Sequence, residues 1–330
     1  MVTIKIEKNE GNQRLDRFLR KYYNKAPLAM IYRMIRKDIK VNGKRLHRQD
    51  MVEEGDVITV YMEEEKASSL RREMVVKKVR RQFSVAYEDA DLLAVSKPVG
   101  LLTHGDSHQR KNTLASQVVA YLVAKGDYHP RGNRTFTPSP ANRLDRNTSG
   151  LVIFGKNAEA LRQLNTMIRQ RDGIEKYYCA IVGGTLTEPL FLKDYMEKDS
   201  RKNQVHVTED PEGRLMETKV YPLAHGQGYT LVKIHLLTGR THQIRVQMAA
   251  CGHPVIGDAK YGAGNINKQV TRRFHLTTQL LHAWQLKFRK GEKAGLTITA
   301  PPPSTFEKIA KELFGTTINF TALIDKDSES

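Results

Sequence analysis

One short segment of the chain places a carboxylate between two guanidinium groups. In the run Asn142-Arg143-Leu144-Asp145-Arg146-Asn147-Thr148-Ser149-Gly150-Leu151, the only acidic residue is Asp145, and it stands between Arg143 and Arg146. An aspartate in this position can stay ionised and face a polyanion, because both neighbours favour its charged form. A charged carboxylate can act as a nucleophile or as a base. Asp145 is therefore the leading candidate for chemistry in this chain.

The residues around this segment predict that it is a loop entering a strand. Pro138-Ser139-Pro140 disfavours a helix before it, and the apolar run Leu151-Val152-Ile153-Phe154 predicts a short strand after it. Between them, Thr148-Ser149-Gly150 supplies small residues that let a backbone or a ligand come close. The Asp145 carboxylate should therefore lie at a strand entrance.

The charge balance of the chain favours a polyanionic partner. Lys and Arg number 54 against 36 Asp and Glu in 330 residues, which gives a formal net charge of +18. Such an excess favours nucleic acid through counterion release, with a membrane surface as the second choice. No segment approaches the roughly 20 apolar residues of a membrane span, and Met1-Val2-Thr3-Ile4-Lys5 lacks the apolar run of a secretory signal. We therefore expect a cytoplasmic protein that does not enter a membrane.

The composition predicts neither a disulfide framework nor a metal centre. Cysteine occurs only at Cys179 and Cys251, too few for a disulfide framework or a Cys-rich zinc site. The His residues are scattered, without the spacing of metal ligands. A Gly-rich phosphate loop with its lysine is also missing from the sequence. We expect no metal ion and no nucleotide cofactor.

Half of the net charge lies near the N-terminus. Between Asn12 and Asp50 there are 12 Lys or Arg and 3 Asp, a net charge of +9. Apolar residues repeat at helical spacing on both sides of Pro27, which predicts two helices. A strand with an Asn-Gly turn follows at 39–44, and a second turn and strand at 55–60. We expect a separate helix-helix-hairpin module over residues 1–66.

The basic residues of this module are candidates for phosphate contacts. A run of charge is more often only a solvated surface, but here the excess is one-sided and coincides with a small folded module. The best candidates for binding nucleic-acid phosphates are Arg14, Arg17, Arg33, Arg36, Lys37, Lys40, Lys44 and Arg45.

The remainder of the chain predicts an α+β fold. Residues 67–81 are polar and basic, without a sustained apolar stripe, and are expected to form a linker. Beyond them, strands outnumber helices and are irregularly interspersed with them, which favours a large mixed, mainly antiparallel sheet. Expected strands run at 83–87, 92–96, 151–154, 174–182, 217–223, 229–237, 280–288 and 296–299, with a helix capped by Asn157 and a last helix begun by a Ser304 and Glu307 capping box. We expect a catalytic domain at 82–315 and a C-terminal tail at 316–330.

Several ordered motifs resemble one enzyme family. Segment 142–151 resembles the R-L-D-x-x-T-S-G signature of the RluA/RluC/RluD-type pseudouridine synthases, which isomerise uridine in structured RNA. Residues 176–183 are similar to their K-x-Y-x-A-x-V-x strand, 237–246 to their L-x-T-G-R-T-H-Q-I-R-V block, 280–283 to their L-H-A strand and 97–101 to their K-P-x-G-x loop. The N-terminal module resembles the S-four-type RNA-binding module that is often fused ahead of such synthases.

The resemblance implies roles for single residues. Asp145 would be the essential carboxylate, Arg245 its cationic partner, and Tyr178 the active-site tyrosine that stacks on the extruded uracil. The resemblance further implies that Leu281 packs beside the pocket and that the presumed cleft is surrounded by Arg143, Arg146 and Arg240, which could grip flanking phosphates. Where the family usually has His, this chain has Asn142, so the role of that side chain stays open. Whether Asp145 adds to the sugar or abstracts a ribose proton stays open as well.

Together these patterns predict a site-specific pseudouridine synthase. The reaction breaks the bond between ribose and uracil nitrogen, rotates the base and forms a bond to carbon 5, so it needs neither an oxidant nor a metal. The favoured substrate is 23S ribosomal RNA of the large subunit, and a monomer is expected. One alternative is an enzyme that acts on transfer RNA or on both RNAs. Another is a noncatalytic RNA-binding ribosome-assembly factor, against which the intact Asp145, Tyr178 and Arg245 argue.

Overall fold

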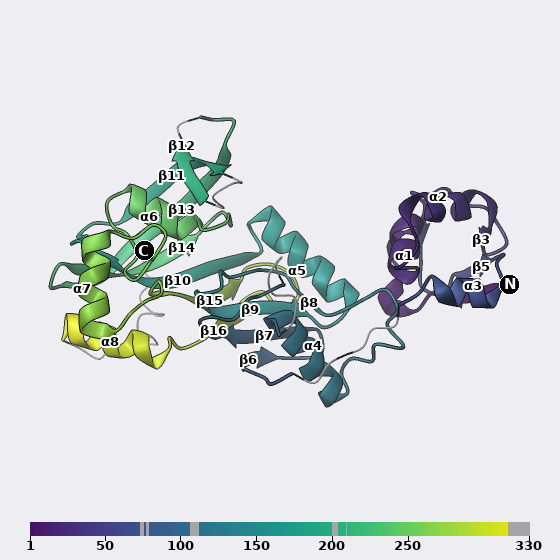
Figure 1. Cartoon of the computed structure of the whole chain (residues 1–330), viewed down its shortest axis with the longest axis horizontal. Helices are drawn as coiled ribbons and strands as arrows, with labels where there is room; N and C mark the ends of the chain where they lie inside the picture. The colour runs from purple at the N-terminus through teal and green to yellow at the C-terminus, as the bar shows by residue number, and fades with distance from the viewer. Residues whose placement is uncertain (73–75, 77–78, 106–111, 200–203, 209, 316–330) are drawn as a thin grey trace. The chain divides into compact units, whose positions relative to one another are not determined.

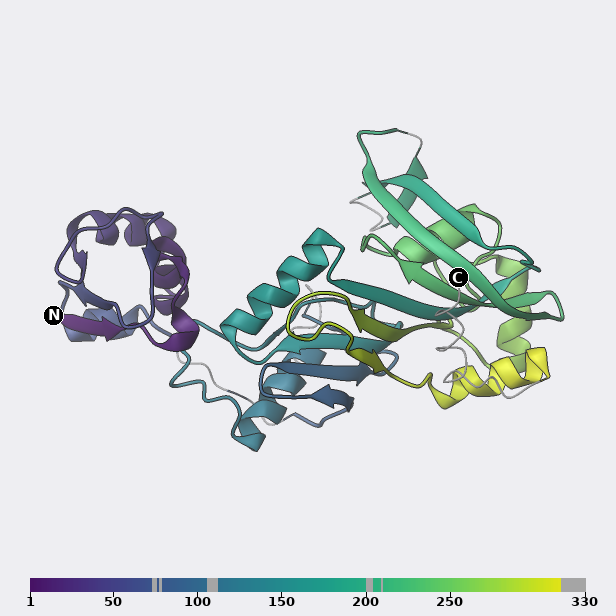
Figure 2. The ribbon, with the colours of Figure 1, turned by 180° about the vertical axis from the view of Figure 1, so that it is seen from behind.

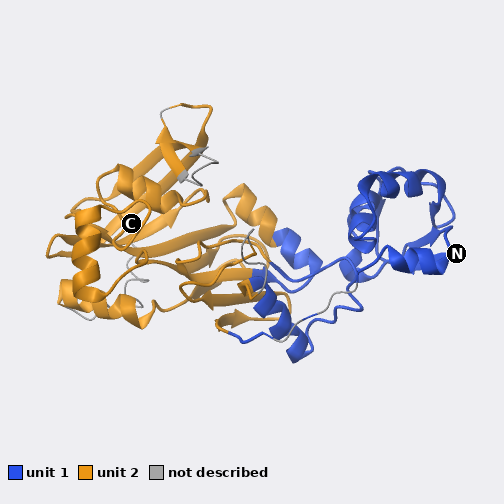
Figure 3. Ribbon diagram, in the orientation of Figure 1, with its two compact units in different colours: residues 1–81, 115–139, 154–163 blue, residues 82–114, 140–153, 164–330 orange. Residues whose placement is uncertain are grey.

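The structure, a computed structural model, describes residues 1–72, 76, 79–105, 112–199, 204–208 and 210–315 (Figures 1 and 2). The expected tail at 316–330 and part of the expected linker lie outside the described residues. Contacts divide the chain into two compact units (Figure 3). Unit 1 comprises residues 1–81, 115–139 and 154–163, and unit 2 comprises residues 82–114, 140–153 and 164–330.

The N-terminal part of unit 1 contains the two predicted helices and two small sheets. Helices α1 (Leu15–Tyr22) and α2 (Leu28–Lys37) lie on either side of Pro27, which is the N-cap of α2. Their apolar faces pack in one buried cluster. This burial of one face explains why the helical spacing of apolar residues predicted both helices. The other elements are β1 (Val2–Lys5), η1 (Lys8–Glu10), β2 (Gln13–Arg14), β3 (Ile39–Val41), β4 (Met51–Val52), β5 (Val57–Val60) and α3 (Glu64–Ser69).

The predicted hairpin in this part is only partly present. Asn42 and Gly43 form a turn with positive φ angles of 50° and 79°, but the turn is closed by a single bridge between Val41 and Lys44. Strand β3 pairs along its length with β5, and β1, which the sequence did not predict, completes the sheet in the order β1-β5-β3. The expected boundary between residues 66 and 67 falls within α3.

An 11-stranded sheet organises the rest of the chain. Its main order is β12-β11-β13-β14-β10-β15-β9-β7-β6, with β8 paired to β9 and β16 to β15. Strands β9 and β15 pair in parallel, whereas the other pairs whose register is described are antiparallel. The α+β fold with a large mixed, mainly antiparallel sheet is thus confirmed. The strands are β6 (Ser84–Glu88), β7 (Leu92–Lys97), β8 (Ser139–Pro140), β9 (Ser149–Gly155), β10 (Ile174–Gly183), β11 (Leu190–Asp199), β12 (Gln204–Thr208), β13 (Arg214–Gly226), β14 (Tyr229–Leu236), β15 (Leu281–Phe288) and β16 (Thr297–Thr299).

The helices described after residue 82 are α4 (Leu114–Lys125), α5 (Ala158–Gln170), α6 (Gln243–Ala250), α7 (Gly264–Phe274) and α8 (Ser304–Phe314). Leu164 of α5 belongs to a core with Ile153 of β9 and Leu286 of β15. Ile309 of α8 belongs to a second core with Cys179 of β10. None of the described helices is long and apolar enough to cross a membrane.

Several local predictions need correction. Strands β11 and β12 and helices α4 and α7 were missed, and Phe191 of β11, with 58% of its surface exposed, shows why an apolar stripe is a poor guide there. The capping box at the start of α8 was wrong: Pro303 is the N-cap, without a side-chain hydrogen bond, and Ser304 is already helical. The cap of α5 was right, because Asn157 Oδ1 accepts a hydrogen bond from Ala160 N at 2.8 Å.

Gly150 brings β9 against β15 at the point where the Asp145 segment enters the sheet. Its φ is +111°, and a Cβ atom there would lie 2.1 Å from the carbonyl oxygen of Ala283. Beside it, Ser149 Oγ lies 2.9 Å from His282 Nδ1. The small residues of this segment therefore allow a close parallel pairing of two strands, which anchors one end of the Asp145 loop.

Candidate active site

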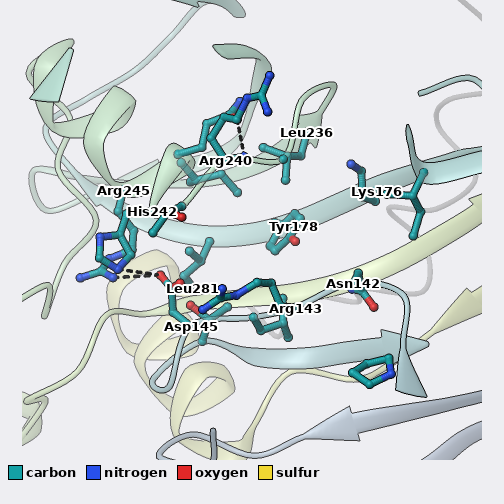
Figure 4. Close-up of a pocket in the computed structure, with 18 of the residues that line it drawn as sticks. Asn142, Arg143, Asp145, Lys176, Tyr178, Leu236, Arg240, His242, Arg245 and Leu281 are labelled. Carbon is teal, nitrogen blue, oxygen red and sulfur yellow. Dashed lines mark hydrogen bonds and ion pairs between the residues drawn. The ribbon is translucent and has the colours of Figure 1, made fainter. Parts of the chain in front are cut away.

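The predicted catalytic residues meet at one cleft in unit 2. The cleft has a volume of about 320 Å³, at the lower end of the roughly 300–1,000 Å³ that is common for small-ligand sites. Its walls come from the loop before β9, from β10, from β15 and from the connection between β14 and α6 (Figure 4). Among the lining residues are Asp145, Tyr178, Arg245 and Leu281.

Arg245 joins two carboxylates at the end of this cleft. Its Nη1 lies 2.9 Å from Asp145 Oδ2, while Nε and Nη2 lie 2.7 and 2.8 Å from the two oxygens of Asp258. Burial would lower the pKa of Arg245, but its hydrogen bonds and charge contacts with Asp258 and Asp145 raise it instead. The guanidinium is therefore charged and fixed in a single plane, with one N–H directed at Asp145.

Asp258 is the residue of this arrangement that sequence reasoning missed. It is buried, with only 1% of its surface exposed, and its Oδ1 also accepts hydrogen bonds from the backbone N–H groups of Lys260 and Tyr261. Burial would raise the pKa of Asp258, but the hydrogen bonds and charge of Arg245 hold it below its usual value. The one local signal, a Gly-Asp pair in a turn, gave no indication of a partner 13 residues earlier.

Buried polar groups hydrogen-bond to the backbone of the loop that carries Asp145. Thr103 Oγ1 donates to the carbonyl of Leu144 at 3.0 Å and accepts from its N–H at 3.2 Å. The fully buried Lys97 directs its Nζ at three carbonyl oxygens, those of Pro98 at 2.9 Å, Leu101 at 2.8 Å and Arg146 at 3.0 Å. Burial lowers the pKa of Lys97 to about 7, against the raising effect of the Asp145 charge. The K-P-x-G-x loop thus holds the backbone next to Asp145.

Helix α6 is positioned by a buried amide at its first residue. Gln243 Oε1 accepts hydrogen bonds from Thr238 Oγ1 at 2.8 Å and from Arg240 N at 3.0 Å. Its Nε2 donates to the carbonyl of Glu217 at 3.1 Å and to Thr218 Oγ1 at 3.0 Å. This network ties the start of the helix to β13, so Arg245, which lies in its first turn, is held at a defined distance from the sheet.

Strand β10 supplies the side wall of the cleft. Tyr178 and Lys176 lie along it on the cleft side (Figure 4). Burial raises the pKa of Tyr178 above its ordinary value, and the charge of Asp145 acts in the same direction. Its hydroxyl therefore stays protonated and can donate a hydrogen bond to a ligand. Burial, aided by Arg171, lowers the pKa of Lys176 to about 8.

The predicted arginines differ in their positions. Arg143 and Arg240 line the cleft, and Arg240 Nε lies 3.3 Å from the carbonyl oxygen of Leu215. Arg146 is not among the lining residues. Its backbone carbonyl instead accepts hydrogen bonds from Lys97 and from Gly100 N, which is 2.9 Å away. Of the three predicted arginines, the structure thus places Arg143 and Arg240 at the cleft wall.

Asn142 has a structural task in this chain. Its Nδ2 donates to the carbonyl of Leu151 at 3.1 Å, and its Oδ1 accepts from Ile153 N at 2.9 Å. The amide thus pairs with β9 as a backbone group would. This pairing gives a physical reason for an amide at a cleft-lining position.

The basic residues of the N-terminal module are mostly exposed. Arg17, Arg33 and Lys37 are exposed, as are Arg36, Lys44 and Arg45. Arg36 and Arg45 line a cleft of about 740 Å³ together with Tyr32 and Arg48. Arg14 is less available, because its Nη2 lies 2.6 Å from Asp16. Lys40 is half-buried, with its Nζ 5.6 Å from the centre of the Tyr61 ring.

Within the described part of the chain, no group of three or more His, Cys, Asp or Glu side chains could hold a metal ion. Among the described residues that line the cleft, Asp145 is the one carboxylate and the other charged side chains are basic, which suits a ligand that carries phosphate.

Comparison with known proteins places this geometry in a family. The family described as RNA pseudouridylate synthase matches residues 91–250. The Ribosomal large subunit pseudouridine synthase C of Escherichia coli (strain K12) is 31% identical over 324 residues, which cover 94% of this chain and 96% of the relative. The chain belongs to the RNA pseudouridylate synthase family.

Other members support the family and its fold. The Ribosomal large subunit pseudouridine synthase C of Buchnera aphidicola subsp. Baizongia pistaciae is 30% identical over 316 residues, which cover 94% of this chain and 96% of that protein. The structure of Human RNA Pseudouridylate Synthase Domain Containing 1 has a TM-score of 0.53 at 23% identity and covers 67% of this chain and 84% of its own. The fold is therefore that of the family, and this RNA pseudouridylate synthase is an enzyme that converts uridine in RNA to pseudouridine.

Proposed function

We propose that this RNA pseudouridylate synthase acts on uridines of 23S ribosomal RNA in the large subunit, with Asp145 as the reacting carboxylate. The observation that carries the chemistry is the pair formed by Asp145 and Arg245 at 2.9 Å in the cleft. Support for the substrate comes from relatives named Ribosomal large subunit pseudouridine synthase C, whose similarity extends over 94% of this chain.

The cleft offers a division of tasks. Arg245 pairs with the carboxylate of Asp145 at 2.9 Å, so a positive charge lies against a side chain that is only 23% exposed. Tyr178 and Leu281 lie where a flipped base would enter, and a protonated phenol can stack on uracil and donate to it. Arg143 and Arg240 can bind flanking phosphates, and we assign Arg146 to the same task at the rim of the loop.

The basic N-terminal module, residues 1–66, provides a second RNA-binding surface. Flipping a uridine out of folded RNA costs a few kcal/mol, which backbone contacts must offset. We propose that Arg17, Arg33, Arg36, Lys37, Lys44 and Arg45 supply most of those contacts, with smaller contributions from Arg14 and Lys40. We propose residues 1–66 as the RNA-binding module, 67–81 as its linker and 82–315 as the catalytic domain, in a monomer that works in the cytoplasm without a cofactor.

Tritium release tests the proposal. Purified protein is incubated with 23S ribosomal RNA or with bulk transfer RNA, each labelled with tritium at carbon 5 of uridine, and released tritium is counted. The proposal expects tritium release from ribosomal RNA with the wild type and none with Asp145→Asn. Sequencing-based maps of the treated RNA should show pseudouridine at discrete sites. Release from transfer RNA alone would contradict the proposed substrate, and equal release from both would support dual specificity.

A further inference from the structure

The fixed oxygen of Asp145 has a second neighbour besides Arg245. His242 Nε2 lies 3.9 Å from Asp145 Oδ2, the same oxygen that accepts the hydrogen bond from Arg245. Figure 4 shows both side chains at the Asp145 end of the cleft. In the part of the chain that the structure describes, no hydrogen bond reaches Asp145 Oδ1. Because both neighbours address Oδ2, Oδ1 is the oxygen left to react.

Tyr261 lies on the Nδ1 side of the His242 ring. The backbone N–H of Val205 donates to Tyr261 Oη at 3.1 Å, and His242 Nδ1 lies 2.9 Å from the same oxygen. Because Oη accepts from Val205, its own hydrogen is available to be donated to Nδ1. A neutral imidazole that accepts at Nδ1 has its proton on Nε2. In this tautomer the N–H of His242 faces Asp145.

The backbone of His242 is strained to reach this position. Its φ is 56° and its ψ is 17°, in the left-handed region, immediately before the first residue of α6. Residues other than glycine rarely adopt this conformation, and such outliers gather at functional sites. The Tyr261 ring, whose hydroxyl holds the imidazole, also lies with its centre 5.2 Å from the Arg245 guanidinium carbon. One tyrosine thus contacts both side chains that approach Asp145.

We propose that His242 is a positioning residue for the reaction. Its neutral ring donates from Nε2 to Asp145 Oδ2 when uridine fills the cleft, and it cooperates with Arg245 to hold Oδ1 toward the ribose. The gap of 3.9 Å closes on substrate binding, since hydrogen bonds at active sites are often long before the substrate is present. The inference rests on the proposed role of Asp145.

Burial favours the neutral form of this ring. Burial lowers the pKa of His242, the charges of Asp145 and Asp258 act against burial, and the charges of Arg245 and Lys260 act with it. A protonated ring would place a second full positive charge at Oδ2 and make the carboxylate a weaker nucleophile or base. Activity should therefore fall as the pH drops through the pKa of His242.

Two variants of His242 separate donation from packing. In His242→Gln, the side-chain amide can place an N–H near the position of Nε2, whereas His242→Leu retains bulk without a donor. At saturating ribosomal RNA we expect single-turnover tritium release to slow about 100-fold in His242→Leu and no more than about 5-fold in His242→Gln, with unchanged RNA affinity. The loss of activity on acidification below about pH 6.5 should disappear in His242→Gln, because the amide does not titrate there.

A spectroscopic measurement reads the tautomer directly. In protein labelled with ¹⁵N at histidine, the ring nitrogens of His242 should show the proton on Nε2. Tyr261→Phe removes the donor to Nδ1, so the ring should become a mixture of both tautomers and the rate should fall a few-fold. The tautomer measurement and the Tyr261→Phe variant still test the proposal if the left-handed backbone at residue 242 does not tolerate Leu and His242→Leu fails to fold.

The outcomes distinguish this inference from the proposed function. Wild-type rates in a folded His242→Leu, or equal slowing in the Leu and Gln variants, would overturn the role of His242 while leaving Asp145 in place. A loss confined to RNA affinity would make His242 an RNA contact and would also overturn it. A proton found on Nδ1 of the wild type would contradict the arrangement. Failure of the wild type itself to release tritium would instead refute the proposed function.

Discussion

Asp258 binds Arg245 through the two guanidinium nitrogens that do not contact Asp145. Its two carboxylate oxygens accept hydrogen bonds from Nε and Nη2 at 2.7 and 2.8 Å, which leaves Nη1 for Asp145. An arginine bound to Asp145 alone could rotate about its long side chain, whereas two parallel bonds to a buried partner fix its plane. The direction of the Nη1 bond is thus set by Asp258, although Asp258 forms no hydrogen bond or ion pair with Asp145 in the described part of the chain.

Asp258→Asn should therefore impair catalysis without impairing RNA binding. The amide can accept only one of the two hydrogen bonds and lacks the charge, so Arg245 is free to move away from Asp145. We expect single-turnover rates to fall about 100-fold, the loss associated with a displacement of about 1 Å. Asp194→Asn is the matched control, because Asp194 accepts a 2.6 Å hydrogen bond from Gln247 of the same helix. Similar rates in both variants would argue against a specific role for Asp258.

Asp145→Asn should abolish isomerisation, because the amide keeps the shape of the side chain but loses the charge that attack or proton abstraction needs. We expect a loss of about 10⁴-fold or more in tritium release, as is common when a reacting group is removed. RNA affinity should stay within a few fold, which filter binding can measure. Appreciable turnover in the purified variant would refute the assignment of Asp145.

Removing two exposed charges from α2 should weaken the salt dependence of RNA binding. Each lost phosphate contact lowers the slope of log affinity against log salt by about 0.7 to 0.9, so Arg33→Gln combined with Lys37→Gln should lower it by about 1.4 to 1.8. Turnover at saturating RNA should hardly change. The control is Lys308→Gln with Lys311→Gln, two exposed lysines on α8. Equal slopes in the two double variants would remove α2 from the RNA contact surface.

Gly150→Ala should destabilise the protein severely. The new Cβ atom would meet the carbonyl oxygen of Ala283 at 2.1 Å and would sit at a φ of +111°, so we expect a loss of about 4 kcal/mol or more. Gly126→Ala is the control, because Gly126 also has a positive φ, +87°, but open space around it. There we expect only about 1–2 kcal/mol. Urea unfolding of both variants measures the two losses of stability. Comparable losses would show that β9 and β15 can move apart at Gly150 at little cost in free energy.

Stability should fall as the pH drops from about 6.5 to about 4. Burial lowers the pKa of His282 to about 4, although its hydrogen bond to Ala300 acts against burial. In this window the unfolded chain takes up a proton that the folded protein refuses, so stability rises with pH and falls on acidification. For a shift of this size the loss reaches about 3 kcal/mol. His235, whose pKa burial also lowers to about 4, acts in the same range.

Urea unfolding at several pH values measures this effect. His282→Gln should flatten part of the dependence, and a double variant with His235→Gln should flatten more of it. The exposed His129 offers a control, since His129→Gln should leave the profile as it is. A wild-type stability that stays constant between pH 6.5 and 4 would contradict the neutral, buried state of His282.

The sequence by itself predicted many of the local elements and the candidate reacting groups. Apolar residues at helical spacing predicted α1 and α2, and the apolar run after Gly150 predicted β9, because burial of one face leaves its period in the sequence. The strands at 83–87 and 92–96 were also predicted, and the structure pairs them as β6 and β7. The sequence singled out Asp145, Tyr178 and Arg245 as candidates because each lies within a motif of several fixed residues.

Only the tertiary structure decided how these groups are held. Asp145 and Arg245 are 100 residues apart, and the support they receive from Asp258 and Tyr261 depends on a loop whose sequence carries no periodic signal. Exposed strands such as β11 also escaped prediction, since neither face is fully buried. Hydrogen bonds of buried polar groups depend on which backbone carbonyl or side chain is brought near by packing, and that information exists only once the strands have paired.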